Sequence, residues 1–257
     1  LELADFEKAV KENTKVVVLS HASNVCGSIL PLEEVGKFCQ SRGLYFIVDS
    51  AQTAGSLPID MVKYNIDALA FTGHKGLLGP QGIGGFLVKK ELSQEMEPLL
   101  TGGTGSLSDR EEFPPYLPDK FEAGTPNIPG IFGLHAALKY LEQQDIIELH
   151  EQALSLTERF LNGVKNIAGI KLVGPQTMRN RTAVVSLDFP GKDNGIIAYQ
   201  LDKDYGIMAR SGLHCSPSAH QTLGTFPQGT LRFSFNHFNT VEEIDYALTA
   251  LQKLLQN

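Results

Sequence analysis

The chain has 257 residues, of which 42% are hydrophobic and 20% charged, as is typical of a globular protein with a sizeable core. Its net charge of −7 argues against a nucleic-acid or anionic-membrane partner, because both need a basic face. No apolar stretch approaches the ~20 residues of a transmembrane helix, and no signal-peptide pattern is evident. Cys26, Cys39 and Cys215 have unrelated spacings, which predict neither a disulfide framework nor a zinc site. We therefore expect no metal and a reduced, cytoplasmic setting.

Residues 1–90 alternate between helical and strand-like patterns. An amphipathic helix is predicted over residues 1–15. A second helix is predicted over Leu32–Arg42, because it follows Pro31 and stops at Gly43. Short apolar runs predict strands at Lys15–Leu19, Leu44–Val48, Ala68–Phe71 and Gly85–Val88. This alternation predicts an α/β domain with a mostly parallel sheet and helices on both sides.

The second half of the chain begins after a segment, residues 101–130, that is rich in Gly, Pro and charge and reads as a long loop. A helix pair with a break near Asp145 follows. Further strands are predicted at Ile170–Val173, Ala183–Phe189, Ile207–Arg210 and Thr230–Phe235, and helices at Asn194–Tyr205 and Val241–Leu255. We place a domain boundary near residue 135, which gives domains of 1–134 and 135–257.

Asp49 and Lys75 each close a short apolar run of the first domain. A strand, a helix and a strand would fill the spacing between them, so both side chains should emerge at the carboxyl edge of one βαβ unit. Open α/β sheets bind ligands at that edge. A lysine for a Schiff base and a carboxylate for a pyridinium nitrogen are the minimum that pyridoxal phosphate (PLP) requires.

Each of these residues also has an ordinary interpretation. Lys75 could be a solvated loop lysine, or part of a phosphate-binding loop, although neither G-x-x-x-x-G-K-[ST] nor G-x-G-x-x-G is present. Asp49 could cap the next helix. Gln52 could reach the hydroxyl of a cofactor ring or face solvent.

Cys215 lies in a Gly/Ser/Pro-rich segment that runs to Gly229, which predicts a mobile loop that closes over substrate. Arg210 and His214 are near in sequence and favour a nucleophilic thiolate. An ordinary loop cysteine is the alternative. A metal site of His214, Cys215 and His220 would lack a fourth ligand.

Arg232 alternates with apolar neighbours in the last predicted strand, so it should share a face with Ser234. Most arginines of this kind are solvated or salt-bridged. A planar guanidinium is also what an enzyme needs to hold a substrate carboxylate through two parallel hydrogen bonds.

A set of motifs in the right order resembles the fold-type I, class V aminotransferase family and, within it, the Suf-type branch of the cysteine desulfurases and selenocysteine lyases. The motifs are His21-Ala-Ser-Asn24, Val48-Asp49-Ser-Ala-Gln52, Thr72-Gly-His-Lys75, Phe121-Glu-Ala-Gly-Thr125-Pro-Asn127, Arg210-Ser-Gly-Leu-His-Cys215-Ser-Pro217 and Arg232-Phe-Ser-Phe. The resemblance implies a large PLP-binding domain, present here as its C-terminal part, and a smaller C-terminal α+β domain. It also implies that the family's N-terminal portion is missing.

For the cofactor, the resemblance implies PLP bound covalently to Lys75, with Asp49 on the pyridine nitrogen. Gln52 and Asn24 would lie on the 3-hydroxyl side of the ring. The residues expected to hold the phosphate are Thr72 and His74, with Thr125 of a neighbouring subunit. That last role implies a homodimer with shared active sites.

For the reaction, the resemblance implies a PLP-dependent cysteine desulfurase that converts L-cysteine to L-alanine and transfers the sulfur to Cys215 as a persulfide. Arg232 would bind the substrate carboxylate, with help from Arg210. The alternatives are a selenocysteine lyase or a class V aminotransferase of the same fold, or an inactive truncated subunit. Whether a separate sulfur-acceptor protein docks near residues 211–229 is left open.

Overall fold

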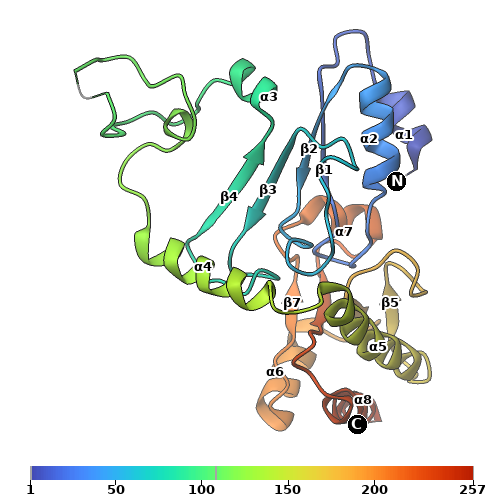
Figure 1. Cartoon of the computed structure of the whole chain (residues 1–257). Helices are drawn as coiled ribbons and strands as arrows, with labels where there is room; N and C mark the ends of the chain where they lie inside the picture. Colours follow the sequence, from blue (N-terminus) through green and yellow to red (C-terminus); the bar gives the residue numbers. More distant parts are fainter. Residues whose placement is uncertain (1, 108, 257) are drawn as a thin grey trace. The chain divides into compact units, whose positions relative to one another are not determined.

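The computed structural model describes residues 2–107 and 109–256, and it divides into two compact units (Figure 1). The first unit takes the chain up to Ser20, then Pro31–Gly55 and Ile59–Gln143. The second takes His21–Leu30, Ser56–Pro58 and the chain from Gln144 onward. The domain boundary near residue 135 stays a prediction.

The first unit contains a four-stranded sheet in the order β1-β2-β3-β4 (Figure 1). Strands β1 (Val16–Ser20), β2 (Tyr45–Asp49) and β3 (Ala68–Thr72) run parallel. Strand β4 (Gly84–Val88) is antiparallel to β3. Because β1, β2 and β3 share one direction, the residues that follow them emerge at the same edge of the sheet.

Five helical segments belong to this unit: α1 (Leu3–Ala9), α2 (Leu32–Ser41), α3 (Lys90–Glu95), η1 (Asp119–Phe121) and α4 (Ile128–Leu141). Helix α2 is predicted with nearly these bounds, and it buries its apolar side chains, including Val35, which is fully buried. Helix α1 is shorter than the predicted 1–15, because Lys11 and Thr14 close a turn through two hydrogen bonds.

The helix that we expected between β2 and β3 is not formed, and this expectation is wrong. In the described chain, residues 51–56 and 61–65 form turns, and the residues between them are irregular. The Ser50 carbonyl accepts from two following amides, and the Asp60 side chain accepts from the amides of Val62 and Lys63. Local side-chain and turn hydrogen bonds of this kind compete with a helix, and Pro58 has no amide to donate.

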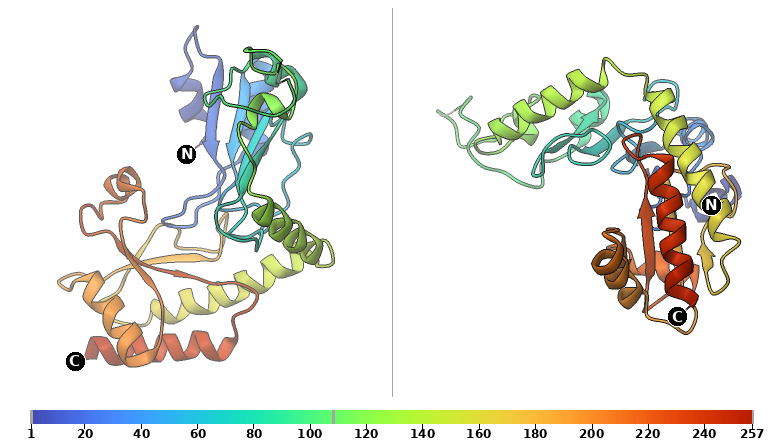
Figure 2. Two further views of the ribbon diagram at one scale, coloured as in Figure 1. Left: turned by 90° about the vertical axis from the view of Figure 1, so that its left-hand side faces the viewer. Right: turned by 90° about the horizontal axis from the view of Figure 1, so that it is seen from below.

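The second unit contains an antiparallel sheet in the order β5-β6-β8-β7. Its strands are β5 (Lys171–Val173), β6 (Val184–Asp188), β7 (Arg210–Gly212) and β8 (Thr230–Ser234), and its helices are α5 (Ile146–Val164), α6 (Asn194–Tyr205), α7 (Pro217–Leu223) and α8 (Val241–Gln256). Helices α5 and α8 lie side by side (Figure 2). The core centres on Phe160, whose ring packs 4.8 Å from that of Phe233.

Two predictions in this unit need correction. The strand expected at Ile207–Arg210 lies at Arg210–Gly212, where it pairs with β8. The segment 211–229 is not a plain loop, because it contains α7. That helix starts with Pro217 at a favoured first position and ends at Gly224, whose φ is 69°. The break near Asp145 is confirmed, since Asp145 caps α5 through the amides of Ile147 and Glu148.

Candidate functional site

The first group of candidate residues lies at the carboxyl edge of the parallel sheet. Asp49 is the last residue of β2, and it pairs with Ala70 of the neighbouring β3. Lys75 follows Thr72, the last residue of β3, in the next turn. Asp49 and Lys75 are both exposed. The strand ends therefore bring a carboxylate and an amine to the same edge of the sheet, where ligands bind in this class of fold.

Backbone hydrogen bonds fix the turn that carries Lys75. The Gly79 amide donates to the Gly73 carbonyl at 2.8 Å, and the Leu78 amide donates to the Lys75 carbonyl at 2.9 Å. The Gly73 amide donates to Ile83 across the neck of the turn. The main chain at Lys75 is thus held in place, while its side chain and that of His74 face solvent.

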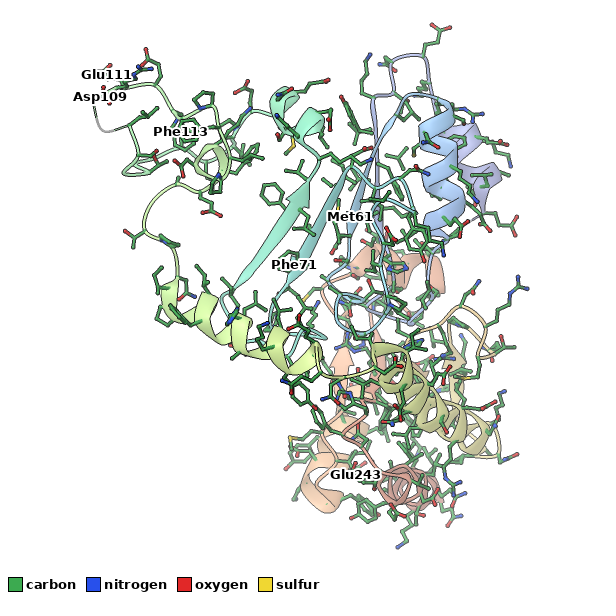
Figure 3. All side chains as sticks on the ribbon, in the orientation of Figure 1. Met61, Phe71, Asp109, Glu111, Phe113 and Glu243 are labelled. Atoms are coloured by element: carbon green, nitrogen blue, oxygen red, sulfur yellow. The ribbon has the colours of Figure 1, made fainter. Side chains whose placement is uncertain are left out.

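Two glycines near the Lys75 turn allow close approaches that a side chain would block. Gly55 has a φ of +79°, and a Cβ atom placed on it would collide with the carbonyl group of Gly76. Only glycine tolerates both the backbone conformation and the close approach. Gly85 of β4 makes room in the same way for the ring of Phe71, which Figure 3 labels on β3.

Asp49 has a local hydrogen bond as well. Its Oδ1 accepts from the Ala51 amide at 2.8 Å, as Asp side chains commonly do in turns. No helix follows for it to cap, because the described residues 51–56 form turns. Gln52 is half-buried in this turn, and the second carboxylate oxygen of Asp49 has no hydrogen bond within the described part of the chain. It remains available to a ligand.

Thr125 lies in a different part of the first unit. It is exposed in the segment between η1 and α4. Within residues 2–107 and 109–256, no hydrogen bond joins its side chain to the Lys75 turn. Asn127, two residues later, caps α4 and also donates to the Gly82 carbonyl at 3.1 Å.

The second group of candidate residues surrounds Cys215, in the turn between β7 and α7. Asn24 holds both neighbours of the cysteine. Its Nδ2 donates to the His214 carbonyl at 2.6 Å, and its Oδ1 accepts from the Ser216 hydroxyl at 3.0 Å. The Cys215 side chain itself is exposed, and Nη2 of Arg210 lies 3.6 Å from its sulfur.

Arg232 of β8 is held in the same cluster. Its Nη1 donates to the Asn24 carbonyl at 2.7 Å, and it faces Arg210 directly across the β7–β8 pair. Burial and the charge of Arg210 lower the pKa of Arg232. Its Nε is buried and has no hydrogen-bond partner among the described residues. Two adjacent guanidinium groups without a carboxylate between them suit an anionic ligand.

His214 is the buried member of this cluster, with 2% of its surface exposed. Its Nε2 lies 3.0 Å from the Thr230 hydroxyl. Burial first, and then the charge of Arg232, lowers the pKa of His214 to about 4, so the ring is neutral at physiological pH. Its ring centroid is 5.6 Å from that of His220, which pairs with Thr225. In the described chain, no group of three or more His, Cys, Asp or Glu residues could hold a metal ion.

Sequence reasoning missed two residues of this cluster. Thr230 and Ser186 are fully buried and hydrogen-bonded to each other. A hydroxyl in the middle of the apolar strand 184–188 was the available signal, because a buried polar side chain needs a partner.

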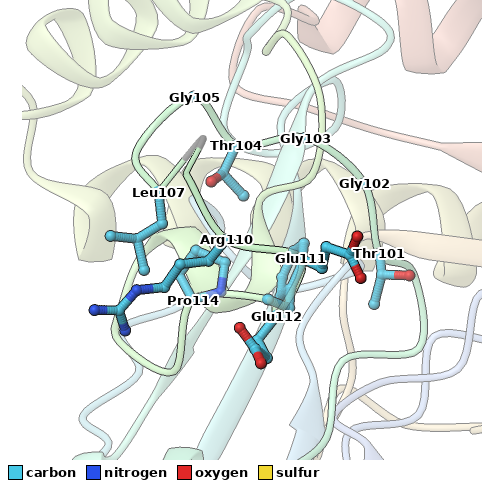
Figure 4. A pocket seen from close by; sticks show the side chains of 11 residues that line it. Thr101, Gly102, Gly103, Thr104, Gly105, Leu107, Arg110, Glu111, Glu112 and Pro114 are labelled. Carbon is cyan, nitrogen blue, oxygen red and sulfur yellow. The ribbon is translucent and has the colours of Figure 1, made fainter.

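Two surface hollows lie elsewhere. One, of about 520 Å³, is formed by the glycine-rich segment Thr101–Gly105 and by residues including Arg110 and Glu111 (Figure 4). The other, of about 380 Å³, lies in the second unit between Tyr205, Phe235 and Tyr246. Neither is lined by a candidate residue, so the candidate site rests on the chemistry at the strand ends.

A lysine and an aspartate lie at neighbouring strand ends of an α/β unit, and an antiparallel unit carries paired arginines and a thiol. This arrangement is typical of the fold-type I class. Comparison with known proteins agrees. The aminotransferase class-V family profile matches residues 1–247. The chain belongs to this family.

Individual relatives are similar over the whole chain. A probable cysteine desulfurase of Pyrococcus abyssi is 39% identical over 260 residues, which covers 100% of this chain and 63% of the relative. A probable cysteine desulfurase of Methanothermobacter thermautotrophicus is 36% identical, covering 96% of this chain and 62% of the relative. The chain thus spans somewhat less than two thirds of these relatives.

Solved structures show the same relationship. The apo structure of a cysteine desulfurase from Thermococcus onnurineus superposes with a TM-score of 0.92 at 37% identity, covering 100% of this chain and 63% of that one. The cysteine desulfurase CsdA of Escherichia coli superposes with a TM-score of 0.88 at 31% identity, covering 98% and 61%. The predicted fold class, an α/β fold-type I transferase with a smaller α+β unit, is confirmed.

Proposed function

We propose that this chain carries the catalytic part of a PLP-dependent cysteine desulfurase that converts L-cysteine to L-alanine. The observation that carries the proposal is the exposed thiol of Cys215, whose two neighbours are held by Asn24 and whose sulfur contacts Arg210. A transaminase of the same fold needs no thiol at this position. The names of the similar proteins support the same activity.

The residues at the sheet edge fit the cofactor. The Lys75 side chain is exposed on a fixed turn, and one carboxylate oxygen of Asp49 is uncommitted at the neighbouring strand end. In the proposal Lys75 binds the PLP aldehyde carbon and Asp49 pairs with the ring nitrogen. PLP, when bound, supplies an electron sink that makes the substrate α-proton acidic.

The other proposed cofactor contacts follow from the resemblance to the class V aminotransferase family. Gln52 would lie near the ring hydroxyl, and Thr72 and His74 near the phosphate. Asn24 fits the ring less simply, because both polar atoms of its side chain are engaged with the Cys215 turn.

The chain's own residues would then act on the substrate in sequence. Arg232, assisted by Arg210, binds the substrate carboxylate through two parallel hydrogen bonds from its guanidinium group. The Lys75 amine takes the α-proton. The Cys215 thiolate attacks the substrate sulfur: a sulfur–sulfur bond forms and the substrate carbon–sulfur bond breaks. The electron pair of the broken bond stays with the carbon, which takes up a proton to become the alanine methyl. Cys215 is left as a persulfide.

A homodimer with shared active sites is part of the proposal. Large apolar side chains are exposed along the segment that precedes α4 and on α4 itself, including Leu99, Leu100, Ile131 and Phe132. Large apolar side chains that are exposed in this way favour burial against a partner. Thr125 is exposed between these residues in sequence, where it could serve a neighbouring subunit.

Location and sulfur delivery complete the proposal. Within the described residues, no helix has both the length and the apolar character needed to cross a bilayer. All three cysteines are free thiols, which supports the reducing cytoplasm that the sequence predicts. A separate acceptor protein would take the sulfur from the exposed Cys215.

A borohydride trap tests the cofactor assignment. The chain is incubated with PLP and reduced, and the modified peptide is located by mass spectrometry. We expect a phosphopyridoxyl group on Lys75 that Lys75→Ala abolishes and Lys63→Ala, an exposed lysine on a neighbouring turn, leaves in place. Labelling at Lys63 and other surface lysines with none at Lys75 would contradict the assignment.

Alanine release from L-cysteine tests the reaction. Cys215→Ser should abolish it while the Lys75 adduct still forms, because the thiol acts after cofactor binding. Undiminished turnover of L-cysteine by Cys215→Ser would contradict the desulfurase mechanism. Turnover of selenocysteine alone would favour the lyase.

A further inference from the structure

A chain of buried hydrogen bonds runs from His214, next to the candidate nucleophile, into the interior of the second unit. His214 Nε2 lies 3.0 Å from Thr230 Oγ1, Thr230 Oγ1 donates to Ser186 Oγ at 3.3 Å, and Ser186 Oγ donates to the Val25 carbonyl. All three side chains are buried, with His214 2% exposed and the two hydroxyl residues fully enclosed. The hydrogen bonds of a buried polar network strengthen one another and restrict the side chains that make them.

The order of donors in this chain determines the tautomer of His214. A carbonyl only accepts, so the Ser186 proton goes to Val25. Ser186 Oγ must therefore accept from Thr230, whose single hydroxyl proton is then used. Thr230 Oγ1 can only accept from His214, and the proton of the neutral ring lies on Nε2. Nδ1 carries the lone pair, and it has no hydrogen-bond partner in the part of the chain that the structure describes.

The backbone that this ring anchors is unusual. His214 and Cys215 have φ values of 50° and 60°, so two successive non-glycine residues are left-handed. Such residues are strained and persist only where the surroundings impose them. Here the surroundings are the anchored His214 ring on one side and the Asn24 amide on the other, which bonds to His214 and Ser216.

We propose that His214 and Asn24 are positioning residues for Cys215: the Nε2–H tautomer anchored on Thr230 and the amide bonds of Asn24 together hold the thiol in its left-handed backbone conformation beside Arg210. This inference deepens the proposed function, on which its role in sulfur transfer rests. These hydrogen bonds are present in the chain without cofactor or substrate, so the positioning of the thiol can be tested without either.

Thr230 offers a matched pair of variants. Thr230→Val keeps the shape but removes the acceptor for His214, whereas Thr230→Ser keeps the hydroxyl. We expect iodoacetamide to label Cys215 roughly fivefold more slowly in Thr230→Val, the factor for losing about one hydrogen bond that orders the reactive conformation. Thr230→Ser should label at close to the original rate. Cys26 and Cys39 are buried and serve as unreactive references in the same peptide map.

Ser216→Ala tests the Asn24 side of the network at a position where unfolding is not expected. Ser216 is the N-cap residue of α7, yet its hydroxyl makes no capping bond to that helix and donates to Asn24 instead. Its loss should slow labelling of Cys215 and speed amide exchange at residues 213–216 without lowering the melting temperature appreciably. The nitrogen NMR signals of the His214 ring should show Nε2 protonated in the original chain and in Thr230→Ser.

The possible results separate clearly. Unchanged labelling and exchange in both Thr230→Val and Ser216→Ala, or a ring protonated on Nδ1, would overturn the proposal. A general loss of stability in Thr230→Val with labelling equal to that of Thr230→Ser would also overturn it, because the network would then be merely structural. Altered labelling in a chain that releases no alanine would support the positioning role and count against the desulfurase function instead.

Discussion

Nη2 of Arg210 lies 3.6 Å from the sulfur of Cys215. Arg210 is the first residue of β7, and Cys215 lies in the turn that follows this strand. Both side chains are exposed, so solvent screens their interaction. The contact nevertheless places a permanent cation beside the only exposed cysteine thiol of the described chain. The guanidinium supplies both a hydrogen-bond donor and a positive charge beside the sulfur.

We therefore expect Arg210→Gln to slow alkylation of Cys215 at neutral pH by roughly two- to fivefold, the size of a solvent-exposed charge interaction. Arg210→Lys should retain part of the effect, and added salt should weaken it in the original chain. The rate is measured with iodoacetamide and peptide mapping. An Arg210→Gln rate equal to that of the original chain at low salt would show that the contact has no influence on the thiol.

The contact between Gly55 and Gly76 supports a second prediction. A Cβ atom on Gly55 would collide with the Gly76 backbone, and its φ of +79° adds strain for any side chain. We expect Gly55→Ala to lower the free energy of unfolding by roughly 2 kcal/mol or more and to weaken labelling of Lys75 by PLP, because the neighbouring turn must move.

Gly43 provides the matched control for Gly55. It also has a positive φ, of +64°, but a Cβ atom there would meet nothing within 4 Å. Gly43→Ala therefore carries the backbone strain without the collision and lies outside the Lys75 turn. Urea unfolding and the borohydride trap are compared for both variants. Equal losses of unfolding free energy and of Lys75 labelling in the two variants would show that backbone strain alone, and not the close approach to Gly76, accounts for the effect of Gly55→Ala.

The sequence predicts some parts of the molecule much better than others. Asp49 and Lys75 could be placed because each follows a short apolar strand, and parallel strands present their ends at one edge. The turns that replace the expected helix after β2 could not be predicted. They depend on local hydrogen bonds that the Ser50 carbonyl and the Asp60 side chain accept. Helix α7 had a usable signal, the Ser-Pro start and glycine end, which the composition of the segment obscured.

The surroundings of Cys215 illustrate a different limit. Asn24 and Ser186 belong to segments far from the cysteine in sequence, and only the fold of the second unit joins them to His214 and Thr230. A resemblance to a family assigns Asn24 to the cofactor but does not reveal these bonds. Long-range hydrogen bonds carry no local signal in hydrophobic periodicity, so they become visible only in the structure.

The core of the second unit depends on Phe160. This side chain is fully buried on α5, and its ring packs against those of Phe233 and Phe235. We expect Phe160→Ala to cost about 3–5 kcal/mol of unfolding free energy, from lost burial and the cavity left behind. Phe238→Ala, at a position that is 64% exposed, should cost far less. Denaturant melts compare the two, and similar midpoints would contradict the assignment of this core.

Acid should destabilise the folded chain before its carboxylates titrate. Burial lowers the pKa of both His21 and His214 from 6.5 to about 4. Between these values the unfolded chain binds protons that the folded chain does not, so stability falls as the pH falls from about 6.5 toward 4. At pH 5 the cost is on the order of 2 kcal/mol for each ring. Urea midpoints measured from pH 7 to 5 should therefore decrease, and His214→Gln should reduce the slope because one of the two rings is gone. A midpoint that stays constant over this range would show that neither histidine is held neutral by the fold.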